Sequence, residues 1–146
     1  MTDKIFIAGA GGQGILALGK ILAEAACAEK KHVTYYPSYG AEIRGGTANC
    51  SVIISNSEIG SPTINRATTM IIMNAPSYKK FIGRLAPDGL LIINSSLADS
   101  GEGLPKGARV TVNFLAFTPR PEVIKLELLL MGEHAVQIGD LARRAL

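Results

Sequence analysis

The stretch Gly9-Ala10-Gly11-Gly12-Gln13-Gly14 decides the fold that this sequence predicts. It is preceded by Lys4-Ile5-Phe6-Ile7-Ala8, a short apolar run typical of a buried parallel strand. It is followed by Ile15, Leu18 and Leu22, which recur at helical spacing among small residues. The glycines at positions 9, 11 and 14 match G-x-G-x-x-G, the pattern that joins a strand to a helix in dinucleotide-binding folds. The stretch therefore predicts an α/β domain.

Each glycine of this turn has a predicted physical role. Gly9 permits the sharp turn, Gly11 lets the backbone approach a phosphate, and Gly14 lets the helix pack closely on the strand. The amides that begin the helix would point outward at the positive end of its dipole, where anions bind. A NAD site also needs an Asp or Glu after the second strand. That strand is expected near residues 32–36 and ends in Pro37-Ser38-Tyr39-Gly40, without an acid. Two interpretations of the glycine turn therefore remain: it binds a nicotinamide nucleotide, or it only allows the helix to pack on the sheet. The second is at least as good as the first.

The composition indicates a single domain with a well-filled core and few charges. Of the 146 residues, 47% are hydrophobic and 18% are charged, with a net charge of +3. This charge is too small for nucleic-acid binding without a dense basic stripe. The apolar runs are too short to span a membrane, and the chain enters its first strand too early for a signal peptide. Cys27 and Cys50 cannot alone hold an iron–sulfur cluster or structural zinc, so we expect two buried, reduced thiols in a cytoplasmic protein.

Strand and helix patterns alternate along the rest of the chain. Strands are expected near 4–8, 33–36, 47–55, 69–73 and 90–94, with a short one at 109–112. Residues 58–61 are predicted to return from strand 47–55 as the second arm of a β-hairpin. Helices are expected from Pro76 to about residue 85, and over 121–131 and 135–146. These patterns predict a Rossmann-like three-layer α/β sandwich with a mostly parallel sheet and an inserted β-hairpin.

A second motif, Tyr39-Gly40-Ala41-Glu42-Ile43-Arg44-Gly45-Gly46-Thr47-Ala48-Asn49-Cys50, carries a resemblance to a known family. Together with the glycine turn, it resembles the gamma subunit of the 2-oxoacid:ferredoxin (acceptor) oxidoreductases, from about Lys4 to about Val112. The variant at 44–50, followed by Ile59-Gly60-Ser61-Pro62, is most similar to the 2-oxoglutarate and branched-chain 2-oxoacid types. After Val112 the sequence departs from the family pattern. Either the protein is shorter there or a segment is missing near residues 113–116, and we favour the second interpretation.

The resemblance implies a pyruvate/ketoisovalerate oxidoreductase gamma-type domain over residues 1–146, working inside a multi-subunit enzyme. Such an enzyme oxidatively decarboxylates a 2-oxoacid, here 2-oxoglutarate by preference, to acyl-CoA. Alpha and beta chains would carry thiamine diphosphate and magnesium. Iron–sulfur clusters, some on a ferredoxin-like delta subunit, would pass electrons to ferredoxin or a similar acceptor. The gamma chain would be inactive alone and would help assembly and the coenzyme A side of the site.

The residues themselves offer binding groups but no catalytic group. Arg44 is the charged side chain that we select, because Gly45 and Gly46 allow close approach and a guanidinium can hold a phosphate or carboxylate through two hydrogen bonds. An ion pair with Glu42 or a role in capping the backbone is an equally good interpretation. The predicted cofactor-binding residues are Gly9, Gly11, Gly12, Gln13, Gly14, Ser38, Arg44, Gly45 and Gly46, with no catalytic residue and no metal ligand. For Gln13 and Ser38 the alternative is that they satisfy backbone groups.

Two other functions are weighed against the enzyme subunit. The glycine turn also suits a stand-alone Rossmann-type nucleotide-binding protein. A pure scaffold subunit without a ligand is the second alternative.

Overall fold

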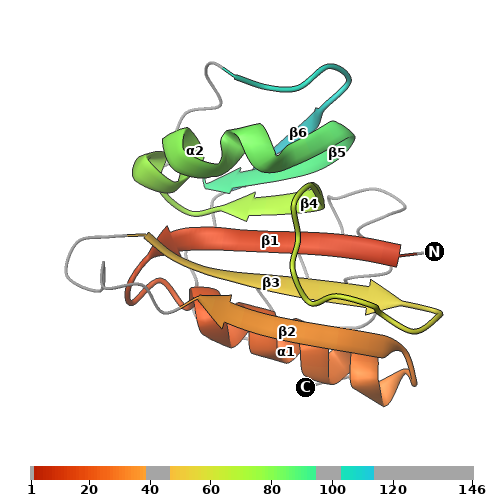
Figure 1. The fold of residues 1–146 in the computed structure, drawn as a ribbon. Helices are drawn as coiled ribbons and strands as arrows, with labels where there is room; N and C mark the ends of the chain where they lie inside the picture. The colour runs from red at the N-terminus through yellow and green to blue at the C-terminus, as the bar shows by residue number, and fades with distance from the viewer. Residues whose placement is uncertain (1, 39–46, 95–102, 114–146) are drawn as a thin grey trace.

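The computed structural model describes residues 2–38, 47–94 and 103–113. Its elements are β1 (Thr2–Ala10), α1 (Ile15–Ala28), β2 (His32–Ser38), β3 (Thr47–Ser55), β4 (Ala67–Ile72), α2 (Ala75–Phe81), the 3₁₀ turn η1 (Ile82–Arg84), β5 (Leu85–Asn94) and β6 (Arg109–Asn113). The described strands form one six-stranded sheet in the order β2-β3-β1-β4-β5-β6 (Figure 1). Strands β1, β4, β5 and β6 are parallel, whereas β3 runs antiparallel to both of its neighbours, β1 and β2.

The strand predictions are confirmed, but the second arm of the hairpin is wrong. Residues 56–66 form bends and irregular backbone without a strand. The antiparallel partners of β3 are β1 on one side and β2 on the other, so neither edge of β3 is left for residues 58–61 to pair with. The inserted antiparallel unit is therefore made by β2 and β3. Two predicted features lie outside the described residues. They are the helices expected over 121–131 and 135–146, and all of the junction near 113–116 except residue 113.

The sheet is covered on both faces, as the three-layer prediction required. Alternating side chains of β1 supply both faces, with Ile5 and Ile7 in the cluster under α1 and Phe6 and Ala8 in the cluster under α2. All four side chains are at most 1% exposed, which explains why the first strand reads as a continuous apolar run. None of the helices in the described ranges is long and apolar enough to cross a membrane.

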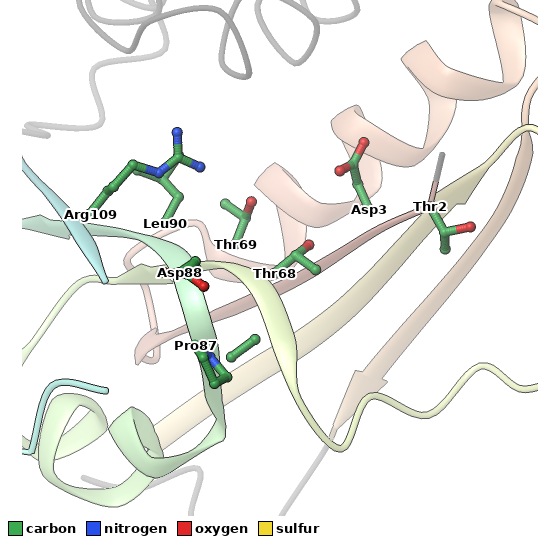
Figure 2. A pocket seen from close by; sticks show the side chains of 10 residues that line it. Thr2, Asp3, Thr68, Thr69, Pro87, Asp88, Leu90 and Arg109 are labelled. Carbon is green, nitrogen blue, oxygen red and sulfur yellow. The ribbon is translucent and has the colours of Figure 1, made fainter. Parts of the chain in front are cut away.

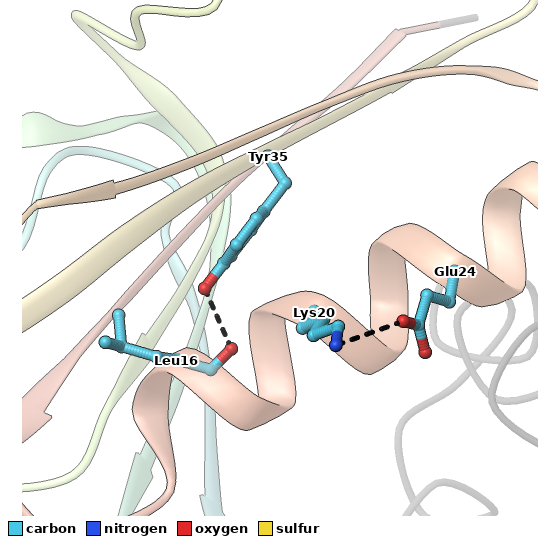
Figure 3. A network of polar contacts seen from close by, with 4 residues as sticks. All are labelled: Leu16, Lys20, Glu24 and Tyr35. Atoms are coloured by element: carbon cyan, nitrogen blue, oxygen red, sulfur yellow. Dashed lines mark hydrogen bonds and ion pairs between the residues drawn. The ribbon is translucent and has the colours of Figure 1, made fainter.

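Helix α1 approaches the sheet closely because Gly19 faces it. A Cβ at Gly19 would lie 2.5 Å from Cys50 Sγ and 3.0 Å from Tyr35 Cε2. The Tyr35 hydroxyl donates to the Leu16 carbonyl over 3.0 Å, and the Cys50 thiol donates to the Ile15 carbonyl over 3.4 Å (Figure 3 shows the tyrosine bond). Gly19, which is not part of the glycine motif, thus allows α1 to pack closely on the sheet.

The solvent-facing side of α1 contains an ion pair and a cysteine, both exposed. Lys20 and Glu24 form an i,i+4 ion pair at 3.6 Å, but both side chains are more than 60% exposed (Figure 3), so the pair contributes little to stability. Cys27 is exposed on this helix, which corrects the expectation that both thiols are buried. The alanines that precede Cys27 fill the inner surface of α1 instead.

On the other face, Arg84 holds a long connection against the sheet. The Arg84 guanidinium lies 4.3 Å from the centroid of the Phe6 ring and donates to the Ile64 carbonyl. Phe6 in turn packs edge-to-face on Phe81 of α2, with ring centroids 5.0 Å apart. Because Ile64 is only 2% exposed, the segment after β3 forms part of this layer.

Candidate functional site at the carboxyl edge of the sheet

The carboxyl ends of the parallel strands lie at one edge of the sheet, which we term the carboxyl edge. Strand β1 ends there at Ala10, opposite Thr47, the first residue of β3. Strand β2 ends there at Ser38, opposite Asn49 of β3. In open α/β sheets, ligands bind beyond the carboxyl ends of the strands, so this edge is the natural place for a site.

The glycine turn at this edge is a tight turn that needs glycine at two positions. The Gln13 N–H donates to the Ala10 carbonyl over 3.3 Å and so closes a four-residue turn. Gly12 has a φ of 86° and Gly14 a φ of 75°, both in the left-handed region that glycine adopts at no steric cost. A positive φ at the third residue is the signature of a type II turn. The conformational demand therefore falls on Gly12 and Gly14.

Gly9 is required by space. A Cβ there would lie 2.6 Å from Gln13 Oε1, 2.7 Å from Ile15 Cδ1 and 2.8 Å from Met73 Cβ. No side chain fits among these three groups without moving them. The first glycine of the motif thus lets the turn, the helix and the end of β4 meet over β1.

The side chain of Gln13 is used within the turn. Its Oε1 accepts from the Ala10 N–H over 2.7 Å, and its Nε2 donates to the Met73 carbonyl over 3.2 Å. Of the two interpretations given for Gln13, these contacts support the one in which it satisfies backbone groups.

Within the described residues the N-terminus of α1 is open, in contrast to that of α2. Gly14 occupies the N-cap position of α1 and has no side chain to cap it, and the first turn of the helix contains no acidic residue. At α2, Asn74 accepts from the Ser77 N–H over 3.0 Å and caps the helix in the usual way. The leading N–H groups of α1 therefore keep hydrogen-bonding capacity beside the positive end of the dipole, an arrangement that suits a phosphate or carboxylate.

Lys80 adds a positive charge near the same edge. Its Nζ donates to the Thr47 Oγ1 over 3.4 Å and lies 5.4 Å from the centroid of the Phe81 ring. Since Thr47 is paired with Ala10, this contact places the ammonium group close to the end of β1. No local pattern in the sequence connects positions 47 and 80, so the sequence did not indicate this contact.

The remaining predicted site residues divide into two groups. Ser38 is exposed at the end of β2, separated from β1 by β3. Arg44, Gly45 and Gly46, together with Glu42, lie outside the described residues. The flanking residues Ser38 and Thr47 are both at the carboxyl edge.

A separate cavity of about 220 Å³ lies at the opposite, amino edge of the sheet (Figure 2). Asp3, Thr69, Asp88 and Arg109 contribute to its lining. Asp88 adopts a φ of 58°, and a Cβ on Gly107 would lie 2.0 Å from its Oδ1. The sequence showed only a Pro-Asp-Gly turn here, where the register between β4 and β5 shifts, and did not indicate a cavity.

The described residues offer no metal centre. They contain no group of three or more His, Cys, Asp or Glu side chains that could hold a metal ion. Burial raises the pKa of the Cys50 thiol to about 12, so Cys50 stays protonated at neutral pH. A protonated thiol is a poor metal ligand.

The strand, the glycine turn and the helix that follow one another at the carboxyl edge define the class of this protein, a Rossmann-like α/β domain. The family model described as pyruvate ferredoxin/flavodoxin oxidoreductase matches residues 4–138, and the chain belongs to this family. The resemblance inferred from the two motifs is thereby confirmed.

Relatives with assigned names are subunits of 2-oxoacid enzymes. The chain is 41% identical over 100 residues to the ketoisovalerate oxidoreductase subunit VorA of Methanothermobacter thermautotrophicus, covering 68% of this chain and 21% of that one. It is 37% identical over 101 residues to the 2-oxoglutarate synthase subunit KorC of Archaeoglobus fulgidus, covering 69% of this chain and 54% of that one. With KorC of Methanocaldococcus jannaschii it shares 30% identity over 145 residues, covering 98% and 75%. The chain thus spans a fifth of the VorA relative and about half of the first KorC relative.

Solved structures show the same fold. The gamma subunit of a keto/oxoacid ferredoxin oxidoreductase from Geobacter sulfurreducens aligns with a TM-score of 0.67 at 23% identity, covering 98% of this chain and 93% of that one. A 2-oxoglutarate:ferredoxin oxidoreductase from Magnetococcus marinus, with 2-oxoglutarate, coenzyme A and succinyl-CoA bound, aligns with a TM-score of 0.70 at 17% identity, covering 98% and 30%.

Proposed function

We propose that this chain is the gamma-type subunit of a 2-oxoacid:ferredoxin oxidoreductase that converts 2-oxoglutarate to its acyl-CoA. The family match over residues 4–138 carries the proposal. The alignment with KorC of Methanocaldococcus jannaschii, which spans nearly the whole chain, supports 2-oxoglutarate as the substrate. The higher identity to VorA over a shorter stretch makes a branched-chain 2-oxoacid the alternative substrate.

The chain would act only with partner chains. In VorA the matching region is 21% of the protein, and in the Magnetococcus marinus structure it is 30% of the chain, so this kind of domain also occurs joined to much longer polypeptides. A separate chain of this kind would need alpha and beta subunits, a ferredoxin-like delta subunit and ferredoxin or a similar acceptor. Its work would be assembly and the coenzyme A side of the site. The enzyme would operate in the cytoplasm, where unpaired thiols such as Cys27 and Cys50 stay reduced.

The donor set at the carboxyl edge suits the phosphates of coenzyme A, and it does not suit an iron–sulfur cluster or a metal ion. The open N-terminus of α1 and the ammonium of Lys80 are groups that bind phosphate. Arg44, which the sequence analysis selected, is the third candidate for a phosphate-binding group at this edge. Coenzyme A, when bound in the complex, supplies the thiol that accepts the acyl group. The iron–sulfur clusters would be carried by the partner chains, since this chain has only two cysteines, one of them buried. Thiamine diphosphate and magnesium would be carried by the alpha and beta chains, as the family resemblance implies.

Reconstitution tests this function directly. The purified chain should show no oxidation of 2-oxoglutarate or 2-oxoisovalerate with coenzyme A and a redox dye. Activity should appear when its alpha and beta partner chains are added, and the preferred 2-oxoacid identifies the substrate. Turnover by the chain alone would refute the proposal. Tight, saturable binding of a nicotinamide nucleotide by the isolated chain would favour the stand-alone nucleotide-binding alternative.

Charge removal at the edge tests the coenzyme A role. A hydrogen bond to a charged group contributes about 1.5–3 kcal/mol, so Arg44→Ala or Lys80→Ala should weaken coenzyme A use or assembly by roughly 10- to 100-fold. The Tm of the free chain should stay nearly unchanged. Lys79→Ala is the matched control, because Lys79 is the exposed neighbour of Lys80 on the same helix. If Arg44→Ala unfolds the free chain yet assembles normally whenever folded, Arg44 is structural.

A further inference from the structure

We infer that Gln13 is a positioning residue, whose side-chain amide holds the glycine turn and the connection between β4 and α2 together as one unit. In this role Gln13 sets where the N-terminus of α1 presents its amides, without touching a ligand itself. The part of this inference that concerns coenzyme A rests on the proposed function; the part that concerns the unit does not.

Within the turn, Gln13 and Ala10 are joined by two reciprocal hydrogen bonds. The Gln13 N–H donates to the Ala10 carbonyl over 3.3 Å, and the Ala10 N–H donates to Gln13 Oε1 over 2.7 Å. The side chain therefore satisfies the backbone donor of the last residue of β1. The turn is closed by main chain and side chain together, which restrains the path from β1 into α1.

The third bond leaves the turn and crosses to another part of the chain. Gln13 Nε2 donates to the Met73 carbonyl over 3.2 Å, and the Met73 N–H donates to the Ala8 carbonyl over 2.9 Å. Met73 is therefore fixed to β1 by its amide and to the turn by its carbonyl. Asn74 follows directly and caps α2, so the start of α2 is tied to the start of α1 through one side chain.

At neutral pH, the primary amide of glutamine is the side-chain group of this length that provides both contacts. Glutamate accepts but does not donate when ionised, and methionine of similar size does neither strongly. The absence of a Cβ at Gly9 provides the room, because that Cβ would lie 2.6 Å from Gln13 Oε1. Gly9 thus leaves the space that the Gln13 side chain occupies, and Gln13 makes the hydrogen bonds there.

The unit formed by the glycine turn and the β4–α2 connection is also linked to the start of β3. Helix α2 begins at this connection and carries Lys80, which donates to Thr47 at the start of β3. A displaced connection would therefore move both positive groups of the edge, the α1 N-terminus and the Lys80 ammonium. A small misplacement of binding groups is enough to weaken a site substantially.

The first experiment compares Gln13→Glu with Gln13→Met in the isolated full chain. At neutral pH the carboxylate introduced by Gln13→Glu would face the Met73 carbonyl without a proton to donate. At about pH 4, near the ordinary pKa of a glutamate side chain, the protonated acid can donate again. We therefore expect the Tm deficit of Gln13→Glu relative to wild type to shrink as the pH falls, while the deficit of Gln13→Met stays constant. If the α1 dipole instead dominates at position 13, Gln13→Glu becomes relatively less stable at low pH, which overturns the inference.

Hydrogen exchange measures whether the turn and the connection form one unit. In Gln13→Met the amides of Ala10 and Met73 should both exchange about tenfold faster or more, because local opening would free both segments. The Met73 amide is the more telling of the two, since its N–H donates to Ala8 and not to Gln13. Faster exchange at Ala10 alone would show a purely local role and would contradict the inference. Lys79→Ala should leave both amides unchanged.

The last readout is made in the reconstituted complex. Gln13→Met should raise the KM for coenzyme A by about tenfold with a much smaller change in kcat, since a displaced edge weakens binding rather than chemistry. An unchanged KM alongside altered exchange would make Gln13 a stability residue only and would overturn its positioning role. If the wild-type complex shows no coenzyme A-dependent oxidation, the proposed function fails, while the pH and exchange measurements still decide the unit.

Discussion

The substitution Gly19→Ala tests the close approach of α1 to the sheet. In a solvent-exposed helix this change stabilises, because alanine has the higher helix propensity by about 1 kcal/mol. Here the added Cβ would lie 2.5 Å from Cys50 Sγ, closer than unstrained atoms pack, and 3.0 Å from Tyr35 Cε2. Cys50 is fully buried on β3, so its sulfur has little space to move away.

The two contributions have opposite signs, and the steric one should be larger. Overpacking a well-filled core costs about 1–3 kcal/mol. Lifting α1 away from the sheet also lengthens the hydrogen bonds from Tyr35 to Leu16 and from Cys50 to Ile15, each of which contributes about 0.5–1.5 kcal/mol. After subtraction of the propensity gain, we expect a net destabilisation of about 1–3 kcal/mol. For a domain of this size, each kcal/mol lowers the Tm by about 2–4 °C.

Urea denaturation of four chains gives the test: wild type, Gly19→Ala, Cys50→Ala and the double variant. Removing the Cys50 sulfur removes the worst contact, so Gly19→Ala should be nearly neutral or stabilising in the Cys50→Ala background. The resulting coupling energy should be at least about 1 kcal/mol, well above the error for independent sites. Gly83→Ala is the matched control, because nothing lies within 4 Å of its Cβ position. Equal effects of Gly19→Ala with and without the sulfur would refute the packing argument.

The further predictions concern the two thiols and Arg84, which lies on the opposite face of the sheet. In the folded chain at pH 8 a thiol reagent should label only the exposed Cys27, and labelling of Cys50, whose pKa burial raises to about 12, should require urea; two fast-reacting thiols would contradict the burial. Because folding raises that pKa above its usual value of 9.0, the native state holds the proton more tightly, and stability should fall as the pH rises from 9 toward 12, less steeply in Cys50→Ala. Arg84→Ala should lower the unfolding free energy by about 2 kcal/mol, since it loses a charged hydrogen bond to Ile64 and the contact with the Phe6 ring. Arg84→Lys should recover part of this loss, and a loss below about 0.5 kcal/mol, the size of an ordinary surface change, would show that Arg84 does not hold the connection.

The sequence alone was sufficient for the parts of the fold that depend on neighbours along the chain. The apolar run of β1, the glycine turn and the helical spacing after it are local patterns, and they predicted a strand and a helix where β1 and α1 are found. The two motifs together predicted the family, because their combination is far more specific than either one. The missing acid after the second strand also came from sequence, and Ser38 stands at that position in the structure.

The tertiary structure determined which of these locally predicted elements are in contact. The sequence could not show that β3 lies between β1 and β2, because strand order depends on pairing between distant segments. That order places Thr47 opposite Ala10 and leaves residues 58–61 without an edge to pair with. The tertiary structure also places Gly19 against Cys50, because the register of α1 on the sheet determines which of its residues meet β3.

The same distinction holds for the candidate site. The pattern G-x-G-x-x-G selected the turn, but Gln13 matches no rule of that pattern, and its partner Met73 lies 60 residues further along the chain. Lys80 and Thr47 are 33 residues apart and meet only because α2 is packed on the sheet beside β1. Sequence determined which residue types stand at the carboxyl edge, because turn and helix signals are local. Their roles were decided by the tertiary structure, because hydrogen bonds and steric contacts depend on distances that only the folded chain sets.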